Sequence, residues 1–379
     1  MNPKIFLVGG AVRDLILGKP PKDLDYVVVG ADLQWMLDRG YKQVGAAFPV
    51  FLHPHTGDEY AMARREKKVA PGYQGFEFEF GPDVTLEQDL SRRDLTMNSI
   101  AFCETTNTFI DPFNGRSDLL NGIIRHTSEA FAEDPLRVLR TARFAARYQF
   151  SIAQETQELC RQLVQNGELD ALSPERIWAE LEKMFSETYP DIGLIFLDNI
   201  GALSTKRLDG LVFSPPINYR LLYNNDVEST MSVIQKMYFG LNLADLSKPQ
   251  LEQFRVPSHI SRECKFYSAI YDVADDFMNG RNANVALPRI VQFFDQYREE
   301  FKGKKHLEVR DFMKKCTDQD YIFCDFFGLF SFLVKFDNAI EALIALDFTE
   351  LVKNLKPSEI KGFVLDTKIN VVKIALGVK

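Results

Sequence analysis

The sequence predicts an α+β protein in which a small mixed α/β domain precedes a chain that is otherwise helical. The first third alternates short β-like runs with glycine-marked breaks. From about Glu133 onward the pattern becomes helical, apart from proline breaks such as Ser214-Pro215-Pro216 and Lys356-Pro357. With 379 residues, 46% of them hydrophobic, the chain is long enough for two or three domains with buried cores.

The expected strands lie in the first domain, and each is bounded by turn-forming residues. They are Lys4 to Val8, Leu24 to Val29, Val50 to His53, Tyr60 to Ala63, Phe76 to Phe80 and Thr108 to Ile110. Between the first two strands, Ala11 to Leu17 has the composition of a short helix that ends at Gly18. The longest apolar run, Phe326 to Val334, is far short of the ~20 residues of a membrane span, so we expect a buried helix and no membrane contact.

Charge and cysteine content limit the classes of partner. The formal charge is -8, from 45 Lys and Arg against 53 Asp and Glu, so any nucleic acid must meet a local basic patch. The Lys-rich stretches Lys302 to Lys315 and Lys353 to Lys379 are candidates, with a solvated helix face as the alternative. Five scattered cysteines without a Cys-x-x-Cys pair, and an N-terminal apolar run too short for a signal peptide, predict a cytoplasmic protein.

The acidic pair Asp23-Leu24-Asp25 opens the second expected strand. Side chains at positions i and i+2 of a strand project from the same face, so Asp23 and Asp25 should point together. Neighbouring carboxylates repel unless a cation lies between them, and hard oxygen ligands suit Mg²⁺. The pair therefore predicts a Mg²⁺ site with Asp23 and Asp25 as ligands, although an isolated Asp-x-Asp is also common in loops and caps.

Upstream of this pair, the first strand runs into Gly9-Gly10 and the short helix. Glycines let a phosphate approach the backbone, and a helix N-terminus offers free N–H groups. Arg13, one turn into the helix, can add a charge-assisted contact to triphosphate oxygens. A Gly-Gly turn alone is more often a plain tight turn, but its combination with the acidic pair, with eight residues between Asp14 and Asp23, is far more specific.

A stripe of four arginines follows Asp134-Pro135. At ~100° per residue, Arg137, Arg140, Arg143 and Arg147 lie within an arc of roughly 120°, opposite Val138, Ala142, Ala145 and Ala146. The stripe suits phosphates and base edges, with a solvated face as the alternative. Asp134 before Pro135 also has the pattern of a helix N-cap.

Several segments, in order over residues 1 to about 205, resemble the tRNA nucleotidyltransferase family. This family comprises CCA-adding enzymes and bacterial poly(A) polymerases, within the polymerase-β-like superfamily. The segments are Leu7 to Asp14 with Asp23 to Asp25, Asp89 to Asn98, Ile110 to Gly115, Glu133 to Arg140 and Leu172 to Trp178. The proteobacterial CCA-adding type is the most similar. The resemblance implies a nucleotidyltransferase head at 1–127, a base-recognising helical neck at 128–205, a helical body at 206–347 and an RNA-contacting tail at 348–379.

The implied reaction is attack by an RNA 3′-hydroxyl on the α-phosphorus of CTP or ATP, which releases pyrophosphate. It adds C, C and A to the 3′ end of tRNA without a nucleic-acid template, and we expect a monomer. Metal held by Asp23 and Asp25 would lower the pKa of the attacking hydroxyl. Glu59 is the expected third acidic ligand, with an exposed strand acid as the alternative reading.

By position, the resemblance makes Asp134 and Arg137 the residues that read the base. Cytosine and adenine each place an amino donor beside a ring-nitrogen acceptor, so an Asp acceptor and an Arg donor satisfy both, whereas guanine and uracil reverse the pattern. The other implied nucleotide contacts are Gly10, Arg13, Arg93, Arg140 and Arg143 for the triphosphate and Asp94 for the ribose 2′-hydroxyl.

The chain also departs from the family pattern. Many bacterial relatives carry an HD phosphohydrolase domain, whose metal site needs a His-Asp pair. None of the five histidines here is followed by Asp, so we expect no phosphatase or phosphodiesterase activity. The segment Gln253 to Ile260 nevertheless faintly resembles a helix of that domain. Gly45-Ala46-Ala47-Phe48 replaces the basic segment of poly(A) polymerases, which favours CCA addition. A poly(A) polymerase, a partial CC- or A-adding enzyme and an inactive RNA-binding relative stay open. The segment Arg64 to Phe76 is expected to help switch from C to A.

Overall fold

The structure, a computed structural model, describes residues 3–44, 50–68, 76–209, 211, 237, 241, 246–278, 283–308, 310–311, 326–349, 351–353 and 355–378. The chain divides into two compact units, Met1–Asp209 and Gly210–Lys379. The finer division into head, neck, body and tail stays a prediction. Gly45 to Phe48, the proline break at 214–216, and parts of the Arg64–Phe76 and Lys302–Lys315 segments lie outside the described residues.

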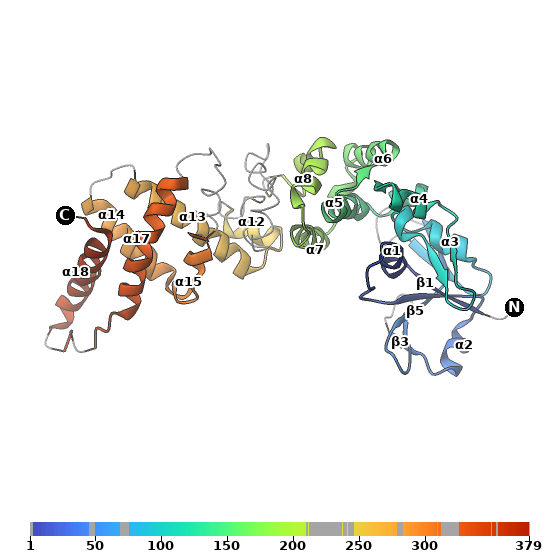
Figure 1. The fold of residues 1–379 in the computed structure, drawn as a ribbon, viewed down its shortest axis with the longest axis horizontal. Coiled ribbons are helices and arrows are strands. Elements are labelled where there is room, and N and C mark those ends of the chain that lie inside the picture. Colours follow the sequence, from blue (N-terminus) through green and yellow to red (C-terminus); the bar gives the residue numbers. More distant parts are fainter. Residues whose placement is uncertain are drawn as a thin grey trace. The chain divides into compact units, whose positions relative to one another are not determined.

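A seven-stranded sheet forms the N-terminal part of the first unit (blue to cyan in Figure 1). Its strands lie in the order β3 (Lys42–Val44), β4 (Val50–Leu52), β5 (Glu59–Met62), β2 (Asp25–Val29), β1 (Lys4–Val8), β8 (Ala101–Cys103) and β9 (Thr108–Ile110). Within this sheet β2 and β5 are parallel, and the other neighbours are antiparallel. β6 (Arg64–Lys68) pairs with β7 (Phe76–Phe80), and β10 (Ile123–Ile124) with β11 (Ser151–Ile152).

All six predicted strands are present, with ends shifted by one residue at most. The predictions missed β3, β6, β8, β10 and β11. Four of these have two or three residues, so they carry too little alternation to be recognised without their partners. The mixed α/β head followed by helices is therefore confirmed.

Alternating side chains of the central strands bury both faces of the sheet. Val8 and Val27 pack with Leu90 of α3 (Leu86–Ser91), whereas Leu7 packs with Val12 of α1 (Gly10–Ile16) on the other face. A third cluster surrounds Met36 of α2 (Leu33–Asp38). The C-terminal end of β1 and the start of β2, which are paired, are therefore held rigidly between two layers.

Four helices follow the head within the first unit: α5 (Leu136–Tyr148), α6 (Gln154–Gln165), α7 (Pro174–Phe185) and α8 (Pro190–Asn199). Short 3-10 turns, η2 (Glu129–Glu133), η3 (Glu168–Ala171) and η4 (Ala202–Ser204), connect or end them. α5 packs on both α7 and α8. A Cβ at Gly193 of α8 would lie 2.8 Å from the carbonyl oxygen of Ala142, so only glycine permits this close approach of α5 and α8.

The described part of the second unit is helical. It contains α12 (Lys248–Gln253), α13 (Ser258–Met278), α14 (Ala283–Gln296), α15 (Arg298–Lys302), α17 (Phe326–Ala345) and α18 (Pro357–Leu376). The apolar run predicted as a buried helix opens α17, where Leu333 is buried but Val334 is 45% exposed. Among the described residues, none of the helices combines the length and apolarity of a membrane span.

Gly115 opens α4 (Gly115–Leu120) against the 3-10 turn η1 (Thr96–Asn98). A Cβ there would lie 2.0 Å from the carbonyl oxygen of Thr96, so the backbone would have to move. We expect Gly115→Ala to lower the free energy of unfolding by ~1 to 3 kcal/mol or more, measured by thermal unfolding. Gly362→Ala in α18, where a Cβ meets nothing within 4 Å, is the control and should be neutral or stabilising. Equal melting temperatures of Gly115→Ala and wild type would contradict the close packing.

Candidate active site

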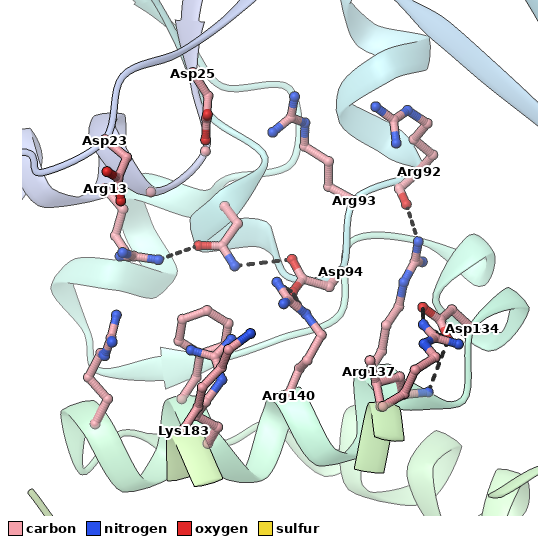
Figure 2. Close-up of a pocket in the computed structure, with 18 residues that line it drawn as sticks. Arg13, Asp23, Asp25, Arg92, Arg93, Asp94, Asp134, Arg137, Arg140 and Lys183 are labelled. Atoms are coloured by element: carbon pink, nitrogen blue, oxygen red, sulfur yellow. Dashed lines mark hydrogen bonds and ion pairs between the residues drawn. The ribbon is translucent and has the colours of Figure 1, made fainter. Parts of the chain in front are cut away.

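A cavity of about 770 Å³ lies between the head and helices α5 and α7 of the first unit (Figure 2). Nine cations and four carboxylates line it, so its wall is cationic although the whole chain carries a charge of -8. The cations are Arg13, Arg92, Arg93, Arg137, Arg140, Arg143, Arg147, Arg176 and Lys183, and the carboxylates are Asp23, Asp25, Asp94 and Asp134. Such a wall suits a polyanion of the size of a nucleotide.

The acidic end of the cavity lies at the start of β2. Asp25 is the first residue of this strand, and Asp23 precedes the strand by two residues in a bend. Both line the cavity, and the side chains labelled in Figure 2 lie close to each other. Burial raises the pKa of Asp25, the nearby Glu59 and Asp23 raise it further, and Arg93 opposes them. This surplus of negative charge, on hard oxygen donors, fits a divalent cation.

Glu59 lies beside Asp25 in the sheet but does not line the cavity. The parallel register of β2 and β5 pairs Asp25 with Glu59, each the first residue of its strand. No three His, Cys, Asp or Glu side chains within the described ranges lie close enough together to hold a metal ion. Glu59 as the third metal ligand therefore stays a prediction.

Two guanidinium groups lie against the Gly9-Gly10 turn. Gly9 has φ of 71°, which favours glycine, and a Cβ at Gly9 would lie 3.3 Å from Arg93 Nη1. A Cβ at Gly10 would lie 3.3 Å from Arg13 Nη2. The turn therefore leaves room for both arginines, and no side chain caps the start of α1.

A buried hydrogen-bonded chain crosses the middle of the cavity. Arg13 Nη1 donates to Asn98 Oδ1 at 2.8 Å, and Asn98 Nδ2 donates to Asp94 Oδ1 at 3.0 Å. Arg140 Nη2 lies 2.7 Å from Asp94 Oδ2. Burial opposes the ionisation of Asp94, but Arg140 and Asn98 outweigh it and hold the pKa of this carboxyl at about 2. Asp94 is therefore an ionised acceptor at neutral pH.

Carboxylates outside the cavity hold other arginines of its wall in place. Arg143 Nε donates to Glu180 Oε2 of α7 at 2.8 Å, and both side chains are less than a tenth exposed. Arg147 Nη2 lies 2.8 Å from Glu187 Oε1, and Arg93 Nη2 lies 3.0 Å from Asp89 Oδ2. The predicted arginine stripe of α5 is therefore not a solvated face, because two of its members, Arg137 and Arg143, are buried.

The predicted base-reading residues are both engaged within the protein. Asp134 Oδ1 accepts the backbone N–H of Leu136 at 3.1 Å, and its Oδ2 lies 2.8 Å from Arg176 Nη2 (Figure 2). Asp134 thus accepts a hydrogen bond from the first N–H of α5, as the N-cap prediction requires, but Pro135 and not Asp134 is the N-cap residue of this helix. Arg137 donates to the backbone carbonyls of Ala130 and Arg92 at 2.6 and 2.7 Å. Both side chains nevertheless line the cavity.

The structure brings together ten of the eleven residues predicted for the site, all except Glu59. Sequence reasoning did not select Asn98, Arg176, Lys183, Asp89, Glu180 or Glu187. Glu180 had a recognisable signal, since it lies in the apolar stripe of α7 with Ile177, Leu181 and Met184, where a carboxylate needs a partner.

Two family models match the first unit. The Poly A polymerase head domain matches residues 5–125, and the probable RNA and SrmB-binding site of polymerase A matches residues 149–205. The Multifunctional CCA protein of Laribacter hongkongensis is 47% identical over 271 residues, which are 69% of this chain and 67% of that protein. The protein of the same name from Neisseria meningitidis serogroup C (strain 053442) is 51% identical over 243 residues, 63% of this chain. The chain spans 58% of the length of that Neisseria protein.

Solved structures show the same fold. A CCA-adding enzyme in complex with ATP superposes with a TM-score of 0.69 at 22% identity, covering 99% of this chain and 86% of that one. A Thermotoga maritima CCA-adding enzyme with tRNA gives a TM-score of 0.64 at 23% identity, covering 100% and 88%. Fold and site thus define a nucleotidyltransferase head joined to helices. The chain belongs to the family of class II CCA-adding enzymes and bacterial poly(A) polymerases.

The low pKa of Asp94 predicts an acid-sensitive contribution to stability. Because its folded pKa of about 2 lies below the usual value for Asp, this contribution is complete above that usual value and is lost as the pH falls toward 2. Between about pH 5 and about pH 3, the free energy of unfolding of wild type should fall by about 1 kcal/mol more than that of Asp94→Asn. Urea unfolding at each pH measures this difference. Asp38→Asn, an exposed carboxylate on α2, is the control and should follow wild type. If the free energies of unfolding of wild type and Asp94→Asn change in parallel with pH, the Asp94 ion pair does not contribute to stability.

Proposed function

We propose that the protein is a CCA tRNA nucleotidyltransferase, monomeric and cytoplasmic, that adds C, C and A to the 3′ end of tRNA from CTP and ATP. The observation that carries the proposal is the cavity, in which two carboxylates at the start of β2 face a wall of arginines. The printed names of the relatives and of the structural neighbours support the choice of CCA addition within this family.

Asp23 and Asp25 are the proposed ligands of Mg²⁺. Bound there, divalent cations would activate the RNA 3′-hydroxyl and neutralise charge on the departing pyrophosphate. Burial, together with repulsion from Glu59 and Asp23, raises the pKa of Asp25. A bound cation would offset both effects, so the two carboxylates favour the occupied site. Arg93, which lines the cavity just after the end of α3, offsets part of the negative charge until then.

The arginine wall is the proposed triphosphate site. Gly9-Gly10 leaves space beside Arg13 and Arg93, and Arg143 adds a cation from α5. Their carboxylate partners lie behind the wall, so the guanidinium groups stay oriented without side-chain reorganisation when the anion binds. A triphosphate along this wall places its α-phosphorus toward Asp23 and Asp25.

Asp94 and the pair Asp134–Arg137 are the proposed ribose and base contacts. An ionised Asp94 accepts a hydrogen bond from the ribose 2′-hydroxyl, a group that a deoxynucleotide lacks. Asp134 accepts from, and Arg137 donates to, the edge shared by cytosine and adenine. Guanine or uracil would place a carbonyl oxygen, itself an acceptor, opposite the carboxylate of Asp134. Each group left without a hydrogen bond in this way costs ~1 to 3 kcal/mol.

We expect Asp23→Ala to abolish nucleotide addition. The change removes one of two metal ligands, and with it several kcal/mol of transition-state stabilisation, so the rate should fall ~1000-fold or more. The assay uses the full chain, Mg²⁺, a tRNA that ends at its discriminator base, and labelled CTP or ATP. Asp83→Ala, an exposed aspartate outside the cavity, should retain wild-type activity. Extension by Asp23→Ala, or unlimited A addition without C by wild type, would contradict the proposal.

Replacement of the base-reading acid should relax nucleotide choice. Asp134→Ala removes the acceptor that disfavours guanine and uracil, so discrimination against UTP and GTP should fall by about 10- to 100-fold while transfer of C and A persists. Competition between labelled nucleotides in the same assay measures this ratio. The matched control is Glu158→Ala on α6, an exposed carboxylate whose partners in the described part of the chain are Arg161 and Gln162 of its own helix. If Asp134→Ala discriminated against UTP and GTP as strongly as wild type, the role of Asp134 would be limited to its hydrogen bond at the start of α5.

A further inference from the structure

One buried side chain bridges two charged residues that line the cavity, Arg13 and Asp94. Asn98, the last residue of η1, is 6% exposed. It accepts from Arg13 Nη1 at 2.8 Å and donates to Asp94 Oδ1 at 3.0 Å. Arg13 and Asp94 are labelled in Figure 2, and a dashed line leaves each of them toward this bridge. Within the described ranges, no other side chain hydrogen-bonds to both.

The chemistry of the two neighbours determines the residue type at the bridge. A guanidinium only donates and an ionised carboxylate only accepts, so the bridge must present an acceptor to Arg13 and a donor to Asp94. An asparagine amide has these two ends at the required separation, and its orientation follows from its partners. An aspartate of the same size would present acceptors in both directions.

Both neighbours are anchored independently of the bridge. The Arg13 guanidinium lies 5.4 Å from the ring centres of Phe144 and Tyr148, and 3.0 Å from Asp14 Oδ1. On the other side, Arg140 and the backbone N–H of Leu95 hold the Asp94 carboxylate at 2.7 and 2.8 Å. The amide therefore connects two fixed points rather than following a mobile one.

We propose that Asn98 is a positioning residue that sets the Asp94 carboxylate relative to Arg13, and thereby determines the preference for ribonucleotides over deoxyribonucleotides. The inference rests on the proposed nucleotidyl transfer, in which Asp94 binds the ribose and Arg13 the triphosphate. Without the amide donor, the remaining hydrogen bonds to Asp94 among the described residues come from Arg140 and one backbone N–H, and its carboxylate turns toward the arginine. The 2′-hydroxyl then loses an acceptor that is aligned with a triphosphate bound at Arg13.

The test is Asn98→Asp, which keeps the size and reverses the polarity of one end. Single additions of CTP and of 2′-deoxy-CTP to the tRNA give kcat and KM for each. We expect kcat/KM for CTP to fall about 10- to 100-fold and that for 2′-deoxy-CTP to change less than about threefold. The ribonucleotide preference should therefore narrow by about tenfold or more.

Thr96→Val is the matched control, because Thr96 belongs to the same turn. It is 2% exposed, and its hydroxyl donates to Asp118 Oδ2 at 2.8 Å, away from the cavity lining. This variant also loses a buried hydrogen bond without a change of size, so its melting temperature should fall while the ribonucleotide preference stays as in wild type. If Thr96→Val decreased the ribonucleotide preference as much as Asn98→Asp does, the role of Asn98 would be structural only.

Retention of the wild-type ratio of kcat/KM values by Asn98→Asp would overturn the inference while leaving nucleotidyl transfer intact. A wild-type enzyme that transfers no nucleotide would instead contradict the proposed function, and the inference with it. If Asn98→Asp does not fold, the double exchange Asn98→Asp with Asp94→Asn again places one amide beside one carboxylate. It gives both Arg13 and Arg140 an acceptor, while the backbone N–H of Leu95 loses the oxygen to which it donates. The double variant should therefore fold, with a lowered melting temperature, and lack the ribonucleotide preference. A preserved preference in this double variant would also refute the inference.

Discussion

Paired burial of the α5 arginines is the interaction on which the arrangement of the first unit depends. Arg137 and Arg143 are less than a tenth exposed, and a buried guanidinium without a partner would cost several kcal/mol. Arg143 therefore needs Glu180 of α7, and Arg137 needs the carbonyl oxygen of Arg92 in the head. Since partners on both sides converge on one helix, α5 is fixed against the sheet domain and against the helices that follow it.

The same pairing separates charge along the cavity. Asp89, Glu180 and Glu187 hold arginines from behind the wall, whereas Asp94 and Asp134 are each paired with an arginine inside the cavity. Asp23 and Asp25 lie at the acidic end, where the pKa of Asp25 is raised by burial and by its acidic neighbours. The acidic end of the cavity therefore favours a bound cation, and the arginine wall favours a bound anion. This polarity suits the proposed reaction, because it orients a nucleoside triphosphate along its length before any base is read.

Base reading in the proposed function replaces existing hydrogen bonds instead of filling vacant ones. Asp134 is bound to Arg176 and to the N–H of Leu136, and Arg137 is bound to two backbone carbonyls. A base that presents the matching edge exchanges one set of hydrogen bonds for another at little net cost, whereas a mismatched base leaves buried groups unpaired. The selectivity therefore comes mainly from the penalty on wrong bases.

The sequence by itself determined the features that depend on neighbouring residues. The two-residue period of a strand predicted that Asp23 and Asp25 point together; both do line the cavity, although Asp23 lies in a bend before the strand. Arg137 to Arg147 share one helix face because of the helical period. Only the tertiary structure determined which distant residues form hydrogen bonds with the arginines of the cavity. Asn98 reaches Arg13 across 85 residues of sequence, and Glu180 reaches Arg143 across 37. Glu59 was predicted for the site, yet it lies beside Asp25 without lining the cavity. Local periodicity carries no information about which distant segment packs there, because that choice depends on burial and charge pairing throughout the unit.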